Sequence, residues 1–122
     1  MTNTRRATTR KTNWVTIDLD RPSRLDIIRV WYNLRHAHPR ILKGRISSSG
    51  EGVHIVAAMS SPIEEREVLD IRRALGDDPN RIIFDEQRPE SKPSQILFDS
   101  KRGKHAGEWV YDLESLERKY RP

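Results

Sequence analysis

The sequence contains no cysteine among its 122 residues. This absence excludes disulfide frameworks, thiolate zinc sites and cysteine nucleophiles, so a metal ion would need oxygen or imidazole ligands. The sequence also has no run of about 18 apolar residues, which a membrane-spanning helix requires. Its polar, basic amino terminus lacks the apolar stretch of a secretory signal. We therefore expect a cytoplasmic protein.

Apolar residues are scarce: they make up 34% of the chain, as do charged residues. A chain of this length forms a single core. We predict one domain at 13–100, preceded by a basic flexible arm at 1–12 and followed by a basic loop and short helix at 101–122. The formal net charge of +5 suits a polyanionic partner. The residues predicted to bind nucleic acid are Arg5, Arg6, Arg10, Lys11, Lys43 and Arg45.

Hydrophobic patterning predicts the element order β-α-β-β-α-β and hence an α+β fold. This order favours a four-stranded antiparallel sheet with both helices on one face, the ferredoxin-like or RNA-recognition-motif (RRM) arrangement. The strands are predicted at 13–19, 41–47, 53–59 and 81–84, and the helices at about 23–35 and 62–75. A fifth strand at 95–98 and a short terminal helix at 113–119 are further candidates.

Alternation along the predicted strands brings polar residues together. In an extended segment Asp18 and Asp20 share one face, opposite the apolar Ile17 and Leu19. The same alternation places His54 on the face opposite the apolar side of its strand. Because the first and third strands are central neighbours in the predicted topology, we expect these three residues to meet on the open face of the sheet.

Two carboxylates at this spacing suit Mg²⁺ or Mn²⁺, which prefer oxygen ligands and complete their shells with phosphates and water. The turn at 47–52 is rich in serine and glycine and suits phosphate, because glycine lets a ligand approach the backbone N–H groups. His54 can donate a hydrogen bond to a triphosphate oxygen. Each feature also has a purely structural interpretation, as a solvated strand end, an ordinary hairpin and a packed histidine.

Three segments together resemble the archaeo-eukaryotic primase superfamily, in particular plasmid and viral primase-polymerases. The similarity covers about residues 14–84. The segments are the apolar run ending in Asp18-Leu19-Asp20, then Ser49-Gly50-Glu51-Gly52-Val53-His54, and finally Asp78-Pro79-Asn80-Arg81-Ile82-Ile83. The middle segment is the most specific of the three.

The resemblance implies a nucleotidyltransferase that makes or extends nucleic-acid primers in the replication of a plasmid, virus or cell. It also implies nucleoside triphosphates, single-stranded DNA or primer-template, and a helicase or second primase subunit as partners. Phosphoryl transfer would use Mg²⁺ or Mn²⁺. The implied catalytic and metal-binding residues are Asp18, Asp20 and Asp78, and the implied nucleotide contacts are Ser49, Gly50, Gly52, His54 and Arg81. Asp85 competes with Asp78 as third ligand, since Asp78 also suits an ordinary turn after a helix.

Two other functions remain open. The first is a rolling-circle replication endonuclease, because His36-Ala37-His38 resembles the histidine pair of its metal site and Tyr111 or Tyr120 is a candidate nucleophile. The two histidines fall at the end of a predicted helix, however, so they could instead simply terminate that helix. The second is a non-catalytic RRM-like module that binds nucleic acid through the basic arm and the open sheet face.

Overall fold

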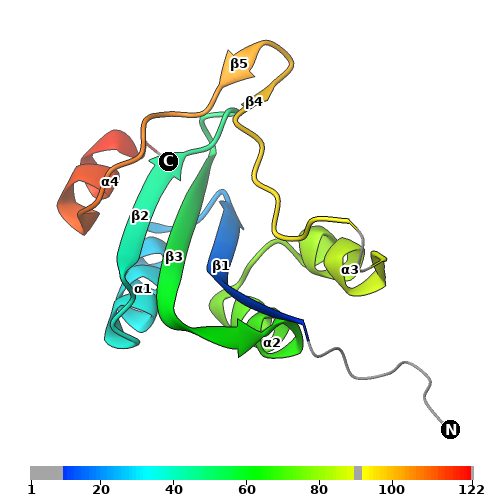
Figure 1. The fold of residues 1–122 in the computed structure, drawn as a ribbon. Helices are drawn as coiled ribbons and strands as arrows, with labels where there is room; N and C mark the ends of the chain where they lie inside the picture. The colour runs from blue at the N-terminus through cyan, green and yellow to red at the C-terminus, as the bar shows by residue number, and fades with distance from the viewer. Residues whose placement is uncertain (1–9, 90–91, 122) are drawn as a thin grey trace, which may run out of the picture.

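The computed structural model describes residues 10–89 and 92–121, which form a mixed α+β fold (Figure 1). Figure 1 shows helices α1 and α2 behind the main sheet, whose other face is turned toward the viewer. Within the described residues, no helix is long and apolar enough to cross a membrane. The elements are β1 (Lys11–Asp20), α1 (Arg24–His36), β2 (Ile41–Ile46), β3 (Gly52–Glu64), α2 (Glu65–Leu75), α3 (Pro79–Gln87), β4 (Ser100–Lys101), β5 (Lys104–His105) and α4 (Leu113–Lys119).

The main sheet has three antiparallel strands in the order β1-β3-β2. The long strand β3 lies in the centre, as the alternating sequence and the short turn before it favour. Strand β1 begins at Lys11, so the last two residues of the predicted arm pair with β3. The register places Asp18 opposite His54 and His54 opposite Arg45, which forms one row across all three strands.

The core lies between the sheet and the helices behind it. Val15, Ile17 and Ile55 are fully buried on the helix-facing side. Helix α1 starts at the predicted cap: the Asp26 N–H donates to the Ser23 hydroxyl at 3.1 Å, and the Ser23 N–H donates to the Asp26 carboxylate at 3.0 Å. Its buried stripe repeats at helical spacing and consists of Ile27, Val30, Trp31 and Leu34.

The carboxy-terminal segment contributes to the same core. Helix α4 packs against β2 and α1, and its Leu116 is fully buried. A Cβ at Gly44 would lie 2.7 Å from a methyl carbon of Leu116, so a larger residue at this position in β2 would force Leu116 to shift. The buried Tyr120 hydroxyl donates to the Pro22 carbonyl at 2.6 Å. These contacts fix the end of the chain next to the start of α1.

The prediction of a strand at 81–84 is wrong, because these residues lie in helix α3. The helix starts at Asp78, whose carboxylate accepts from the Asn80 N–H at 2.9 Å, and Pro79 occupies its first turn. Of the apolar run that suggested a strand, Ile82 is buried, whereas Phe84 is 70% exposed. Residues 95–98 also form no strand. A short apolar run does not by itself distinguish a strand from a helix.

Side chains occupy the edge of β1 where a fourth strand was expected. The Thr16 N–H donates to Gln95 Oε1 at 2.7 Å, and Gln95 Nε2 donates to the Trp14 carbonyl at 2.7 Å. The Asp18 N–H donates to Asp77 Oδ1 at 2.8 Å. The Asp18 carbonyl in turn accepts from the Asp78 N–H at 3.1 Å. The backbone of this edge is therefore satisfied without a strand partner.

Candidate functional site

In the row across the three strands, His54 lies between Asp18 on β1 and Arg45 on β2. Arg45 Nε donates to His54 Nδ1 at 3.0 Å, and His54 Nε2 lies 3.7 Å from Asp18 Oδ1. Because Nδ1 accepts this hydrogen bond, the proton of the neutral imidazole lies on Nε2, the nitrogen nearest Asp18. The sheet register thus presents an N–H group beside a carboxylate.

His54 is neutral near pH 7. Its pKa is lowered to about 4, chiefly by burial and also by the positive charges of Arg45 and Arg81, against the opposing effect of Asp99. The contact between His54 and Asp18 is therefore not an ion pair at neutral pH. His54 offers a hydrogen-bond donor without a charge.

Asp18 has the opposite shift. Its pKa is raised to about 6: burial is the largest cause, Arg81 opposes it, and the carboxylates of Asp77, Asp78 and Asp20 add to it. Four carboxylates thus concentrate negative charge at this end of β1. A cation bound here would relieve that repulsion.

The serine and glycine turn lies at the same end of the sheet, because Gly52 pairs with Asp20. The turn is closed by its own hydroxyls: the Gly52 N–H donates to Ser47 Oγ at 3.0 Å, and the Glu51 N–H donates to Ser49 Oγ at 3.1 Å. Gly50 has a positive φ of 82°, which glycine adopts readily. Of the implied nucleotide contacts, Ser49, Gly50 and Gly52 therefore lie at the strand ends next to Asp20.

Of the two candidates for third ligand, only Asp78 lies next to Asp18. Its N–H donates to the Asp18 carbonyl, and its carboxylate caps α3 through Asn80. Asp85 instead accepts from Arg72 at 2.8 Å and from the Gln95 N–H at 3.1 Å. Its carboxylate helps to anchor the segment that follows α3.

Sequence reasoning missed Asp77, whose side chain is fully buried between β1, α2 and α3. Its Oδ2 accepts from Arg72 Nε at 2.7 Å, and its Oδ1 accepts from Arg81 Nη1 at 2.6 Å and from the Asp18 N–H. Arg81 also donates to Thr16 Oγ1 at 2.8 Å. The guanidinium predicted to contact nucleotide is thus engaged in fixing α3 to β1.

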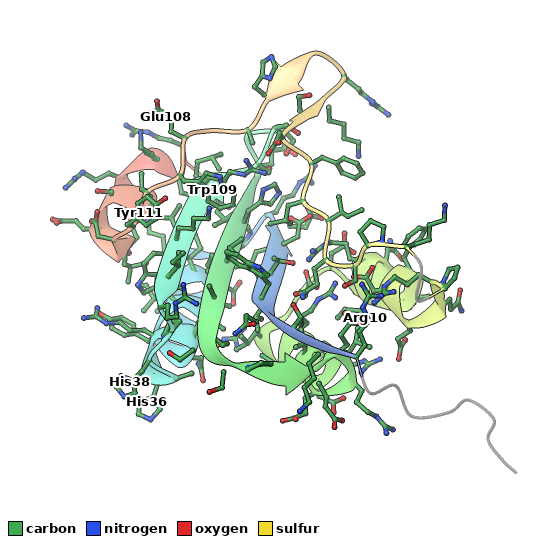
Figure 2. The ribbon with its side chains drawn as sticks, in the orientation of Figure 1. Arg10, His36, His38, Glu108, Trp109 and Tyr111 are labelled. Carbon is green, nitrogen blue, oxygen red and sulfur yellow. The ribbon has the colours of Figure 1, made fainter. Side chains whose placement is uncertain are left out.

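Arg45 is enclosed by residues from the segment after α3. Its side chain is 5% exposed, and Nη1 donates to Asp99 Oδ1 at 2.9 Å while Nη2 donates to the Phe98 carbonyl at 3.3 Å. The guanidinium carbon lies 4.2 Å from the centre of the Trp109 ring, and Lys43 Nζ lies 4.5 Å from it. Figure 2 shows Trp109 beside β2. Sequence reasoning assigned no site role to Asp99 or Trp109.

Replacing Arg45 should raise the pKa of His54. In Arg45→Met the nearest positive charge is removed, and we expect the pKa of His54 to move up from about 4 but to stay below 6.5, because burial is the largest cause of the shift. An NMR titration of the imidazole measures this value. Lys43→Met is the matched control, since Lys43 also lies on Trp109 but is not among the causes of the shift. Equal His54 pKa values in the two variants would contradict this electrostatic account.

The other predicted nucleic-acid contacts are dispersed. Arg5 and Arg6 lie outside the described residues. Arg10 Nε lies 3.3 Å from a Glu65 carboxylate oxygen, and Lys11 is exposed at the start of β1. Figure 2 shows Arg10 on the opposite side of the sheet from Trp109. The structure therefore does not bring Arg10 and Lys11 together with Arg45 (Figure 2).

The two histidines and Tyr111 of the endonuclease hypothesis lie away from Asp18 and Asp20 (Figure 2). The rings of His36 and His38 stack at 6.5 Å at the end of α1, and Figure 2 shows them at the lower corner of the molecule. His38 and the exposed Tyr111 line one open cavity of about 660 Å³. Tyr120 is buried and bonded to Pro22. The histidines lie at a helix end and not on a central strand.

Across residues 10–89 and 92–121, no group of three or more histidine or carboxylate side chains is arranged to hold a metal ion by itself. Asp18 and Asp20 nevertheless supply oxygen donors two residues apart on one strand face. Comparisons of the chain with protein-family models, curated proteins and solved structures gave no match.

Proposed function

We propose that this chain is a primase-polymerase-like domain that binds a nucleoside triphosphate with Mg²⁺ or Mn²⁺ and transfers the nucleotidyl group to a nucleic-acid primer. One observation carries the proposal: three segments far apart in sequence meet at one end of the open sheet face. Asp18 pairs with His54, Asp20 pairs with Gly52, and the Asp78 N–H donates to the Asp18 carbonyl. In this proposal the sheet is a ferredoxin-like sheet whose fourth strand is replaced by side chains from α3 and the following segment.

The donor set fits a hard divalent cation held in part by its substrate. Asp77 is fully used by protein donors and Asp78 caps α3, which leaves Asp18 and Asp20 as metal ligands. Mg²⁺ commonly takes one or two protein carboxylates and fills its remaining positions with phosphate oxygens and water. When bound, such an ion would neutralise charge on the phosphates and activate the attacking hydroxyl.

The chain itself would orient the triphosphate. The His54 Nε2–H group would donate a hydrogen bond without adding charge, and the hydroxyls of Ser47 and Ser49, which bond to each other, lie in the turn at the same end of the sheet. Arg45 holds the imidazole ring through Nδ1 and thereby fixes which nitrogen carries the proton. We therefore assign Arg45 as a positioning residue for His54.

The test is a calorimetric titration of ATP and dATP into the protein in the presence of Mn²⁺. We expect the double substitution Asp18→Asn with Asp20→Asn to weaken nucleotide binding by at least about tenfold, which corresponds to about 1.4 kcal/mol. The matched control is Glu67→Gln with Asp70→Asn, which removes the same charge from the exposed face of α2. Equal binding by the two double variants, or no binding by the wild type, would overturn the proposal.

A further inference from the structure

A short hairpin extends from the sheet beside the candidate site. Strands β4 and β5 pair with each other, and Figure 1 shows them projecting beyond the end of β2 and β3 that carries the turn at 47–52. The residues at its tip, Arg102 and Gly103, have φ of 53° and 79°. Two successive positive φ values are those of a type I′ turn, the connection that matches the twist of a two-residue hairpin.

The hairpin carries basic residues and no acid. Its exposed residues include Lys101, Arg102, Lys104 and His105. Within the described part of the chain, none of these four forms an ion pair with a carboxylate. Because the charges are adjacent and uncompensated, they create a local positive potential that favours a polyanion.

The base of the hairpin is fastened to β2 on both sides. On the incoming side, Asp99 accepts from Arg45 at 2.9 Å, and the Phe98 carbonyl accepts from the same guanidinium. The Ala106 N–H donates to the Asp99 carbonyl at 2.7 Å, and the Gly107 N–H donates to the Ile46 carbonyl at 2.9 Å. These bonds link the hairpin to the end of β2, next to the turn at 47–52, and fix the position of its basic residues relative to the sheet.

We propose that the β4–β5 hairpin is a nucleic-acid-binding element that grips the phosphate backbone of a strand beside the triphosphate site. The inference rests on the proposed function for the position of that strand, while the binding itself rests on the hairpin alone. The segment from Ser100 to His105 has no large apolar side chain to enter a lipid bilayer. An anionic nucleic-acid backbone is therefore a better match than a membrane surface.

The experiment measures the affinity for labelled oligothymidylate by fluorescence anisotropy over a range of salt concentrations. The hairpin variant combines Lys101→Gln, Arg102→Asn and Lys104→Gln, where asparagine tolerates the positive φ at the turn. Its matched control removes the same charge from exposed positions on α2 and α4 through Arg66→Gln, Arg118→Gln and Lys119→Gln. We expect the slope of log K against log salt to become shallower by about 2 in the hairpin variant, because each lost phosphate contact on a single strand contributes about 0.7.

In the control variant the slope of log K against log salt should differ from the wild-type slope by no more than about 0.7, the contribution of one phosphate contact. Equal slopes in the two triple variants would overturn the proposal, as would tighter binding of the wild type to phosphatidylserine vesicles than to the oligonucleotide. ATP binding in Mn²⁺ should be unchanged in the hairpin variant. Failure of the hairpin test with intact ATP binding would overturn only this inference, whereas strand binding without ATP binding would overturn the nucleotidyltransferase and retain a binding module.

Discussion

Asp77→Ala is expected to lower the free energy of unfolding by about 3–5 kcal/mol, the usual cost of removing one partner from a buried ion pair. The substitution leaves Arg72, which is 1% exposed, without the carboxylate that accepts its Nε–H group. It also removes the acceptor of the Asp18 N–H on the edge of β1. A domain of ordinary stability has only about 5–15 kcal/mol in total. Urea denaturation followed by tryptophan fluorescence measures the loss.

Asp70→Ala is the control for this substitution. Asp70 is an exposed residue of α2 that pairs with Arg73 at 3.2 Å, with side chains 79% and 42% exposed. Exposed pairs contribute at most about 1 kcal/mol, because water screens them. If Asp77→Ala cost no more than Asp70→Ala, the carboxylate would not be holding α2, α3 and β1 together.

The importance of Asp77 follows from the missing fourth strand. An open edge of a sheet exposes N–H and C=O groups that must find partners or water. Here the partners are Asp77, the backbone of Asp78 and the side chain of Gln95. The same carboxylate that replaces a strand hydrogen bond also contributes to the raised pKa of Asp18. The structure of this edge and the electrostatics of the candidate site are thus coupled.

The faces on which Asp18 and His54 lie could be predicted because they depend on local periodicity. Alternation fixes which side chains share a face, and the closed turn between β2 and β3 limits the register. The adjacency of β1 and β3 follows instead from the order of the elements, and together these constraints predict that Asp18 and His54 meet. Helix α3 also had a signal in the sequence, since Asp78 followed by Pro79 is a common helix start, but the apolar run after it was given more weight.

The remaining partners of the site could not be predicted by the same means. Gln95 reaches Thr16 across 79 positions, and Asp99 reaches Arg45 across 54. Neither contact leaves a periodic pattern, because each arises from an irregular segment that crosses the sheet. The burial of Arg45 depends on these contacts, so its role beside His54 became visible only in three dimensions.

His54 and Asp18 should change the unfolding free energy of the metal-free protein in opposite directions as pH changes. In wild type each contribution therefore masks the other. Below pH 6.5 His54 binds a proton in the unfolded state, whereas in the folded state it stays neutral down to about pH 4. This residue therefore lowers the unfolding free energy as pH falls. Asp18 binds its proton more tightly in the folded state, with a pKa of about 6 against 3.8, so it lowers stability as pH rises. Between about pH 4 and 6 the two contributions largely cancel.

Single substitutions should separate the two titrations, because neither residue is among the causes of the other's shift. Arg45, Arg81 and Asp99 remain around His54 in Asp18→Asn, so the unfolding free energy of this variant should fall by about 3 kcal/mol as pH falls from 6.5 to 4, without the opposing Asp18 contribution of wild type. The unfolding free energy of His54→Gln should instead fall by about 2 kcal/mol as pH rises from 4 to 6, without the opposing His54 contribution of wild type, a value reduced because the Asp18 carboxylate is partly exposed. Urea denaturation in EDTA at successive pH values measures both profiles. Parallel profiles for the two variants would contradict this account of the two titrations. Profiles of opposite slope would confirm that a buried neutral histidine and a partly exposed carboxylate lie side by side at neutral pH.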